Sequence, residues 1–343
     1  MALIANKREF LARGLRGLGI VRLLEHLARR PGLLVLTYHR IGDPSASPYY
    51  APVASATPDA LEAELVTLRR THRVIGVEEA ADLADRGFPT KEPLALVTFD
   101  DGYRDNFEAA LPVLISQSIP AAFFLPTAFI STPRLPWWDH IAYVINTTSV
   151  PLLRLDWPRA LDVDLERIPR RDAIALIVQM YLAHHVSDEP RFREALEARA
   201  GVEVDEEILG RSLFMSWDEA RSLTAAGMSI GSHGHSHRAL SGLSEDEQRA
   251  DLVESKRILQ HELGRDVIAL AYPYGWPGTY NDITTNLAQE AGYRLAFASV
   301  EGINRPGAAN PHALRRLGVG YADAPLVHRA RWALMEAFGK SLV

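Results

Sequence analysis

The chain contains no cysteine, which excludes disulfide bonds and thiolate metal sites. Any bound metal must therefore be held by nitrogen and oxygen ligands. No apolar run approaches the ~18 consecutive residues that a membrane-spanning helix requires, so we expect no transmembrane segment. Positive charge is not in excess either. The formal net charge is −6, which disfavours nucleic acid as a partner because phosphate binding depends on clustered positive charge.

What remains is the composition of a globular protein of 343 residues, of which 47% are hydrophobic and 23% are charged. Length alone allows either two average domains or one large α/β barrel. Nothing in the composition predicts an oligomeric state.

Residues 7–30 combine basic side chains with apolar positions at helical spacing, which is typical of an amphipathic helix. The apolar residues are not gathered into one run before a cleavage site, so we predict no signal peptide and a cytoplasmic location. Packing on the protein's own surface is the favoured role of this helix, and peripheral attachment to the inner face of the membrane is the alternative. We therefore separate an N-terminal element, residues 1–30, from a barrel domain, residues 31–343.

The barrel domain alternates short apolar runs with amphipathic stretches. Strands are predicted at residues 33–37, 73–77, 94–99, 121–125, 228–230, 267–271, 295–299 and 314–319. Alternation of strands with helices predicts an α/β fold with a parallel sheet, either open or closed into a barrel. The rhythm breaks at about residues 131–213, where helical patterns occur without a clear strand, and we predict a helical insertion there. Residues 42–57 are expected to form a long loop.

Three of the twelve histidines, His233, His235 and His237, lie within five residues directly after a predicted strand. Imidazole nitrogen suits zinc and its neighbours in the periodic table, and two imidazoles can share one ion if a third ligand comes from elsewhere. The alternative is a polar loop whose histidines are only solvated. The density of histidines favours the metal site.

Other polar residues also follow predicted strands. Asp100 and Asp101 come after the strand at 94–99, and His39 comes after the strand at 33–37. In a βα barrel such positions gather on one face, where catalytic groups are built. Two histidines and one aspartate would hold a metal with open coordination positions, and the second aspartate would be free to act as a base. The alternative for the aspartate pair is a helix N-cap, which Asp favours.

These motifs together resemble those of the NodB-like polysaccharide deacetylases, carbohydrate esterase family 4. The sequence TFDDG at residues 98–102 is similar to the first motif of that family, SHGHSH at 232–237 to the second, and YPYG at 272–275 to a third. The resemblance implies a distorted (β/α)7-type barrel. It also implies metal-dependent removal of acetyl groups from N-acetylated sugars of a polysaccharide or cell-surface glycan.

The resemblance assigns roles to individual residues. It implies that Asp101, His233 and His237 bind the metal and that Asp100 is the general base. Zinc is the expected metal, with cobalt, nickel and manganese as alternatives. The backbone N–H of Tyr274 is expected to stabilise the oxyanion. The residues expected to contact the sugar are Tyr272, Pro273, Trp276 and Trp138, and packing inside the protein is the alternative for the tryptophans.

Two details depart from the family pattern. The family often has an arginine before the Pro-Tyr-Gly motif, where this chain has Ala271. Arg315 or Arg316 could supply the guanidinium, and we favour Arg316. The family's late Leu-x-His motif is matched only in the last predicted helix, at His328, so we favour His39 as the general acid over His328 and His312.

The missing arginine motivates one rival, a glycan-binding barrel without catalytic activity. A second rival is hydrolysis of a non-glycan amide on the same scaffold, because fold and motifs do not determine the substrate. The sequence leaves open the sugar, its linkage and the acyl group.

Overall fold

The structure is a computed structural model and describes residues 31–184, 188–321 and 325–338. The N-terminal helix predicted at residues 1–30 lies outside the described residues. The chain divides into two compact units. Among the described residues, the first unit comprises 31–42, 55–131 and 214–338, and the second comprises 43–54 and 132–213.

A parallel, barrel-like sheet forms the centre of the first unit. Its strands are β1 (Gly32–Tyr38), β5 (Pro93–Phe99), β6 (Ala121–Leu125), β9 (Ser229–Ser232), β10 (Ala269–Ala271), β11 (Leu295–Ala298), β12 (Leu314–Arg315) and β13 (Leu317–Gly318). They follow the order β12-β11-β10-β9-β6-β5-β1-β13, and β4 (Arg73–Val74) pairs with the start of β5. The short strands β2 (Arg40–Ile41) and β3 (Ala54–Ala56) form a separate pair. The predicted α/β barrel is confirmed.

The last predicted strand, residues 314–319, closes the ring in two halves. β12 pairs with β11 on one edge of the sheet, through Leu314 opposite Phe297. β13 pairs with β1 on the other edge, through Leu317 opposite Leu36. Arg316 is the only residue between the two halves, so the strand that joins both edges is interrupted at an arginine.

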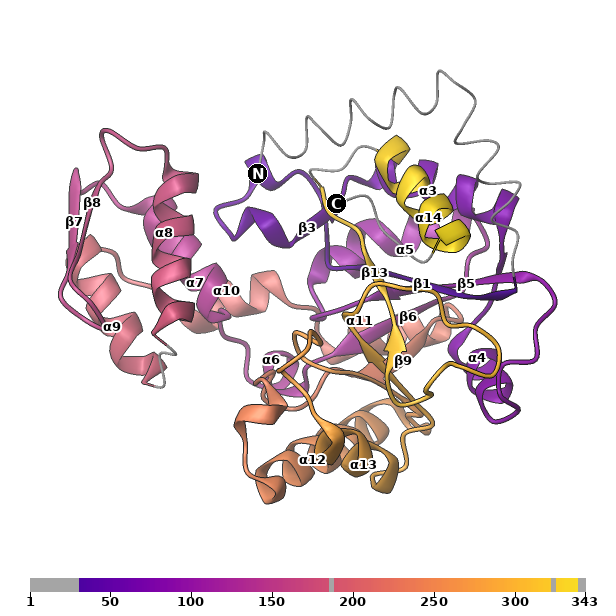
Figure 1. Cartoon of the computed structure of the whole chain (residues 1–343). Coiled ribbons are helices and arrows are strands. Elements are labelled where there is room, and N and C mark those ends of the chain that lie inside the picture. Colours follow the sequence, from indigo (N-terminus) through magenta and orange to yellow (C-terminus); the bar gives the residue numbers. More distant parts are fainter. Residues whose placement is uncertain (1–30, 185–187, 322–324, 339–343) are drawn as a thin grey trace. The chain divides into compact units, whose positions relative to one another are not determined.

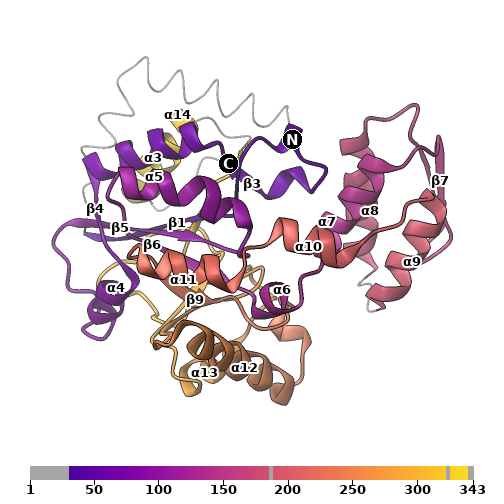
Figure 2. The same ribbon diagram turned by 180° about the vertical axis from the view of Figure 1, so that it is seen from behind.

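Helices surround this barrel-like sheet. In Figures 1 and 2, α3 (Pro58–Thr71), α5 (Leu111–Ser116) and α14 (Pro325–Phe338) lie together on one side, and α12 (Glu245–Leu263) and α13 (Asp282–Glu290) on the other. The remaining helices of this unit are α4 (Val77–Ala84), α6 (Thr127–Ser131) and α11 (Trp217–Ala225), with a π-helical turn at Asn106–Ala110. No helix in the described ranges combines the length and apolar character needed to cross a bilayer.

The strand residues that point into the barrel are apolar along its length and are followed by polar residues at its carboxyl end. Alternate strand residues, including Val35, Leu96, Phe124 and Phe297, form one buried cluster that α4 residues complete. Because successive strand side chains point to opposite faces, the same inner row continues past the strand ends. It reaches His39 after β1, Asp100 after β5, His233 after β9 and Arg316 after β12.

The second unit has its own hydrophobic core. Its helices are α7 (Trp137–Thr147), α8 (Arg170–Ala183), α9 (Glu189–Ala200) and α10 (Glu206–Leu213). The expectation of no strand here was wrong, because β7 (Leu152–Leu155) and β8 (Leu161–Asp164) form an antiparallel pair. Both strands are only half-buried and contain charged residues, so neither forms the apolar run that marked the barrel strands in the sequence. Residues 43–54, expected to be part of a long loop, also belong to this unit.

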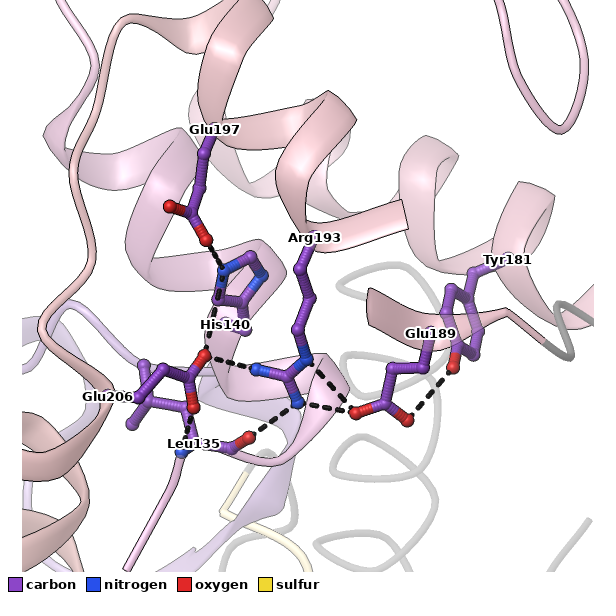
Figure 3. A network of polar contacts seen from close by, with 7 residues as sticks. All are labelled: Leu135, His140, Tyr181, Glu189, Arg193, Glu197 and Glu206. Atoms are coloured by element: carbon purple, nitrogen blue, oxygen red, sulfur yellow. Dashed lines mark hydrogen bonds and ion pairs between the residues drawn. The ribbon is translucent and has the colours of Figure 1, made fainter. Parts of the chain in front are cut away.

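A buried polar network links the helices of the second unit (Figure 3). Arg193 on α9 donates to Glu189 at 2.6 Å and to the carbonyl of Leu135 at 2.7 Å, and it also pairs with Glu206. His140 on α7 has no exposed side-chain area, and its Nε2 lies 2.8 Å from Oε1 of Glu197. Tyr181 on α8 also donates to Glu189 at 3.3 Å, so the network joins all four helices of this unit.

Candidate metal centre

Three buried side chains converge at the carboxyl end of the sheet. The ligand atoms of Asp101, His233 and His237 all lie within 4.8 Å of one another. Oδ1 of Asp101 is 3.1 Å from Nε2 of His237 and 3.3 Å from Nε2 of His233. In the part of the chain that the structure describes, no other group of three or more such residues meets this criterion.

The donor set fits a divalent metal ion. Nδ1 of His233 lies 2.7 Å from the carbonyl oxygen of Ala271, which can only accept a hydrogen bond. Nδ1 therefore carries a hydrogen, and Nε2 is the nitrogen that faces Asp101. A metal-binding histidine typically donates its other ring N–H in this way. Two imidazoles and a carboxylate suit zinc and neighbouring divalent ions.

The charges in the cluster also favour a cation. Burial alone would raise the pKa of Asp101, but hydrogen bonds from His233 and His237 hold it well below its usual range. Burial alone would lower the pKa of His233, but Asp100 and Asp101 raise it above its usual value. The carboxylates thus attract positive charge to His233. A metal ion would take the place of a proton there, as metal binding generally releases protons.

Asp100 lies beside the ligands but has a different partner. Nη1 and Nη2 of Arg316 each lie 2.8 Å from one of its carboxylate oxygens, and the Arg316 side chain is only 1% exposed. Nη2 of Arg316 also lies 3.3 Å from Oγ of Ser299. Burial raises the pKa of Asp100, but the charges of Arg316 and nearby histidines outweigh burial and lower it. Asp100 is thus ionised and oriented by a bidentate pair.

Arg315 does not reach this site, because successive strand residues point to opposite faces. Its Nη1 donates instead to the carbonyl of Glu301 at 3.1 Å. Of the two arginines considered from the sequence, only Arg316 pairs with Asp100.

The site also contains unusual backbone. Five non-glycine residues in the described ranges have a positive φ, and three of them are Asp101 (73°), His237 (55°) and Tyr274 (62°). Such conformations cost roughly 1–3 kcal/mol each and cluster at functional sites. Tertiary contacts must therefore hold these three residues in place.

His39 lies on the same face. Its backbone N–H donates to Oγ of Ser55 at 2.9 Å, and its carbonyl accepts from Nδ2 of Asn106 at 2.6 Å. The charge of His39 contributes to lowering the pKa of both Asp100 and Asp101, so its ring interacts electrostatically with both carboxylates.

The other histidines considered are held elsewhere. Nδ1 of His235 lies 2.8 Å from Oγ1 of Thr127, and Nε2 of His312 lies 2.9 Å from the carbonyl of Tyr293. His328 is buried on α14 and pairs with Glu64, which also accepts a hydrogen bond from Tyr38. Of the three candidate acids, only His39 is among the charges that lower the pKa of both aspartates.

The expected sugar-binding residues are not all equally accessible. Tyr272 is fully buried, and its hydroxyl donates to the carbonyl of His312 at 2.8 Å. Pro273 is also buried. Trp138 is 6% exposed and belongs to the second unit. The side-chain contacts to sugar expected for these residues therefore find no support in this geometry.

Trp276 differs from them. Its side chain is 50% exposed, and its ring lies 5.2 Å from that of Tyr274. The ring of Tyr274 is in turn 5.1 Å from that of His237. A line of aromatic rings therefore runs from a candidate ligand to solvent.

Asp251 on α12 is a site residue that sequence reasoning missed. Its carboxylate accepts hydrogen bonds from the backbone N–H groups of His235 at 2.7 Å and Ser236 at 2.9 Å. Gly234 packs against it, and a Cβ there would lie 2.8 Å from its Oδ1. Asp251 thus holds the loop between the two histidine ligands. Within its helix nothing distinguishes Asp251 from other acidic residues, so the sequence carried no signal for this role.

The fold and the site together define an α/β barrel with a buried Asp-His-His cluster that could hold a metal ion. The family model described as "Polysaccharide deacetylase" matches residues 88–153 and 181–296, more than half of the chain. The chain belongs to the polysaccharide deacetylase family.

Curated relatives are distant. The chain is 20% identical over 252 residues to the putative polysaccharide deacetylase YxkH of Bacillus subtilis, covering 72% of this chain and 59% of the relative. It is 20% identical over 200 residues to the poly-beta-1,6-N-acetyl-D-glucosamine N-deacetylase of Escherichia coli K12, covering 52% of this chain and 28% of the relative. The chain thus spans well under two thirds of either protein.

Solved structures share the fold. The Streptococcus pyogenes deacetylase PplD in complex with acetate has a TM-score of 0.56 at 19% identity, covering 86% of this chain and 95% of that chain. IcaB from Ammonifex degensii has a TM-score of 0.56 at 22% identity, covering 89% and 98%. At these identities the likeness is one of fold.

Proposed function

We propose that this chain is a metal-dependent deacetylase that hydrolyses the N-acetyl groups of a polysaccharide or cell-surface glycan. The observation that carries this proposal is the buried Asp101–His233–His237 cluster beside an aspartate held by Arg316. Membership of the family and the names of the relatives support the choice of substrate class. The sugar and its linkage stay open.

Asp101, His233 and His237 would hold the ion, most simply zinc. When bound, a divalent cation polarises a carbonyl and lowers the pKa of water to ~7. Asp100 would accept a proton from the attacking water, and its pair with Arg316 keeps it ionised for that task. The backbone N–H of Tyr274 would donate to the developing oxyanion.

The second half of the reaction breaks the carbon–nitrogen bond. The departing sugar amine is basic and needs a proton, and His39 is the candidate acid because it follows β1 on the same face and its charge acts on both aspartates. The products are acetate and a free amino sugar. Trp276 would stack on a sugar ring, because its indole is half-exposed and continues the row of rings from His237.

Acetate release tests this function. The full chain is stripped of metal, reloaded with zinc, cobalt, nickel or manganese, and incubated with β-1,4- and β-1,6-linked oligomers of N-acetylglucosamine. We expect acetate only from reloaded protein. Asp100→Asn should retain the metal and lose about 10²–10⁴-fold in rate, as expected for loss of a general base. The matched control is Asp246→Asn, an exposed residue of α12.

The same experiment decides between the rivals. Bound metal without acetate from any acetylated glycan would favour a binding protein, and faster hydrolysis of simple non-glycan amides would favour the amidohydrolase. The hypothesis of a glycan-binding protein without activity rested on the missing arginine before the YPYG motif. It is weakened because the guanidinium of Arg316 pairs with Asp100.

Location stays a prediction. The favoured prediction is a cytoplasmic protein whose basic amphipathic segment, residues 7–30, packs on its own surface, and attachment to the anionic inner face of the membrane is the alternative. Co-sedimentation with anionic vesicles at low salt tests this, and no binding under those conditions would end the idea.

A further inference from the structure

A pocket lies on the outer face of β12, apart from the candidate metal centre. Its volume is about 390 Å³. Ligand pockets generally measure ~300–1,000 Å³, so this pocket suits a ligand of one or two sugar rings. The loop from β11 to β12 supplies most of its walls, and Tyr280 and Arg315 complete it. Arg316 points inward to Asp100, whereas its neighbour Arg315 lines this pocket.

The lining is electropositive. It contains Arg305 and Arg315 and no carboxylate, in a chain whose formal net charge is −6. Glu301, the nearest acid along the loop, is paired with Arg331 at 2.5 Å. Among the described residues, the exposed guanidinium of Arg315 donates a hydrogen bond only to the backbone carbonyl of Glu301 and has no carboxylate within ion-pair distance.

Two residues of the loop between β11 and β12, Gly302 and Asn304, fix the position of Arg315. The buried side chain of Asn304 donates to its carbonyl at 2.9 Å and accepts from its N–H at 2.9 Å. Gly302 has a φ of 156°, and a Cβ there would lie 2.5 Å from Cδ of Arg315. A side chain at residue 302 would displace the arginine, so the close packing depends on glycine.

Tyr280 supplies a second polar group. Its ring stacks on that of the buried Tyr272 at 4.7 Å, which orients the hydroxyl. Burial raises the pKa of Tyr280 although Arg315 opposes the shift, so the hydroxyl keeps its proton at neutral pH. The remaining lining combines the exposed amide of Asn310 with small apolar walls that include Ala308, Ala309 and Ala313.

We propose that this pocket binds an anionic sugar, a ring that bears a carboxylate or a phosphate. Arg315 pairs with the anionic group, Tyr280 and Asn310 hydrogen-bond to the hydroxyls, and the apolar walls contact the ring. Such a ligand is either an acidic residue of a glycan or a free sugar phosphate. The two sources share the same chemistry.

Calorimetric titration of the full chain tests the pocket. D-Glucuronate and D-glucose 6-phosphate represent the two sources, D-glucose tests the ring alone, and inorganic phosphate tests the charge alone. We expect saturable binding of one or both anionic sugars at one site per chain. Arg315→Gln should weaken it about 10-fold or more, because hydrogen bonds to charged groups contribute ~1.5–3 kcal/mol. Tyr280→Phe keeps the ring stack and should weaken it about threefold to tenfold.

The matched control is Arg265→Gln, which removes the same charge from an arginine of this unit that does not line the pocket. Three outcomes would overturn the proposal. They are no saturable binding of either anionic sugar, equal weakening by Arg265→Gln and Arg315→Gln, and binding of glucose or phosphate as tight as that of the anionic sugars. No acetate release is measured, so failure of this pocket and failure of the deacetylase function are separate results.

Discussion

The two compact units each bury histidine among carboxylates, but they balance the charge in opposite ways. In the first unit, Asp101 faces His233 and His237, and the nearby guanidinium of Arg316 is engaged by Asp100. In the second unit, the guanidinium of Arg193 lies inside the cluster and pairs with Glu189 and Glu206 (Figure 3).

The pKa values of His140 and His233 follow this difference, whereas burial lowers the pKa of His237 despite its contact with Asp101. Burial and Arg193 lower the pKa of His140 to about 3, so His140 is neutral and donates to Glu197. The carboxylates around His233 raise its pKa instead. In the second unit, Arg193 already neutralises the carboxylates of the cluster. In the first unit, Arg316 pairs with Asp100, so the charge of Asp101 is left for a metal ion.

The largest expected effect is loss of a metal ligand. His237→Ala should abolish both the bound metal and acetate release, because two ligands cannot hold a catalytic ion as three do. His140→Ala is the matched control and should leave the metal content unchanged. Equal metal loss in both variants, measured by inductively coupled plasma mass spectrometry, would contradict the contrast between the clusters.

Arg316→Gln should separate orientation of the base from binding of the metal. The substitution leaves Asp100 buried without its cation, and we expect kcat to fall by on the order of 10²–10⁴, the contribution of general-base catalysis. Metal content should stay near one per chain. Arg265→Gln serves as the control, and an unchanged kcat in Arg316→Gln would rule out the assigned role.

Arg193→Met should destabilise the second unit. Removing one partner of a fully buried pair costs roughly 3–5 kcal/mol. The Glu189 and Glu206 side chains are 32% and 31% exposed, so solvent reduces the cost and we expect about 2–3 kcal/mol. Hydrogen exchange of α9 measures it. The exposed pair of Arg211 and Glu207 provides the control, since Arg211→Met should cost less than about 1 kcal/mol.

Asp251→Asn should weaken the metal centre without removing a ligand. The variant accepts fewer hydrogen bonds from the loop at 235–236, and changes in outer partners generally cost 10–100-fold in affinity. We therefore expect the zinc dissociation constant to rise about 10-fold or more, as measured by chelator competition. Asp246→Asn on the same helix should not change it, and equal affinities in all three proteins would refute the role.

The smallest effect is a dependence of stability on pH in the second unit. Folded His140 has a pKa of about 3 against 6.5 for the free side chain, so the unfolded chain binds more protons between these values. Stability should therefore fall as the pH drops below 6.5, by up to about 1.4 kcal/mol per unit. The pKa of Glu197 is raised from 4.5 and its contribution has the opposite sign, so the slope is assigned to His140 only by comparison with a variant that lacks this histidine.

Hydrogen exchange of α7 in wild type and in His140→Gln, which does not titrate, measures this slope. A slope that persists in His140→Gln would assign it to another group.

The first unit was predicted more fully from the sequence than the second. The alternation of strands and helices predicted the barrel, because each strand carries a local pattern of apolar residues. The motifs predicted which residues of the first unit would meet, because the carboxyl ends of parallel strands share one face. The hairpin of the second unit, β7 and β8, was missed because its strands are half-buried and contain no apolar run like those of the barrel.

The sequence by itself determined the class of fold and the types of residue at the metal centre, since both depend on local patterns and on short motifs. Only the tertiary structure decided the partners. Arg316, not Arg315, pairs with Asp100 because the closing strand joins two edges of the sheet and is interrupted at that residue. Likewise Asp251 reaches the histidine loop from a separate helix. Both contacts join residues that are distant along the chain, so no local pattern in the sequence predicts which side chains pair.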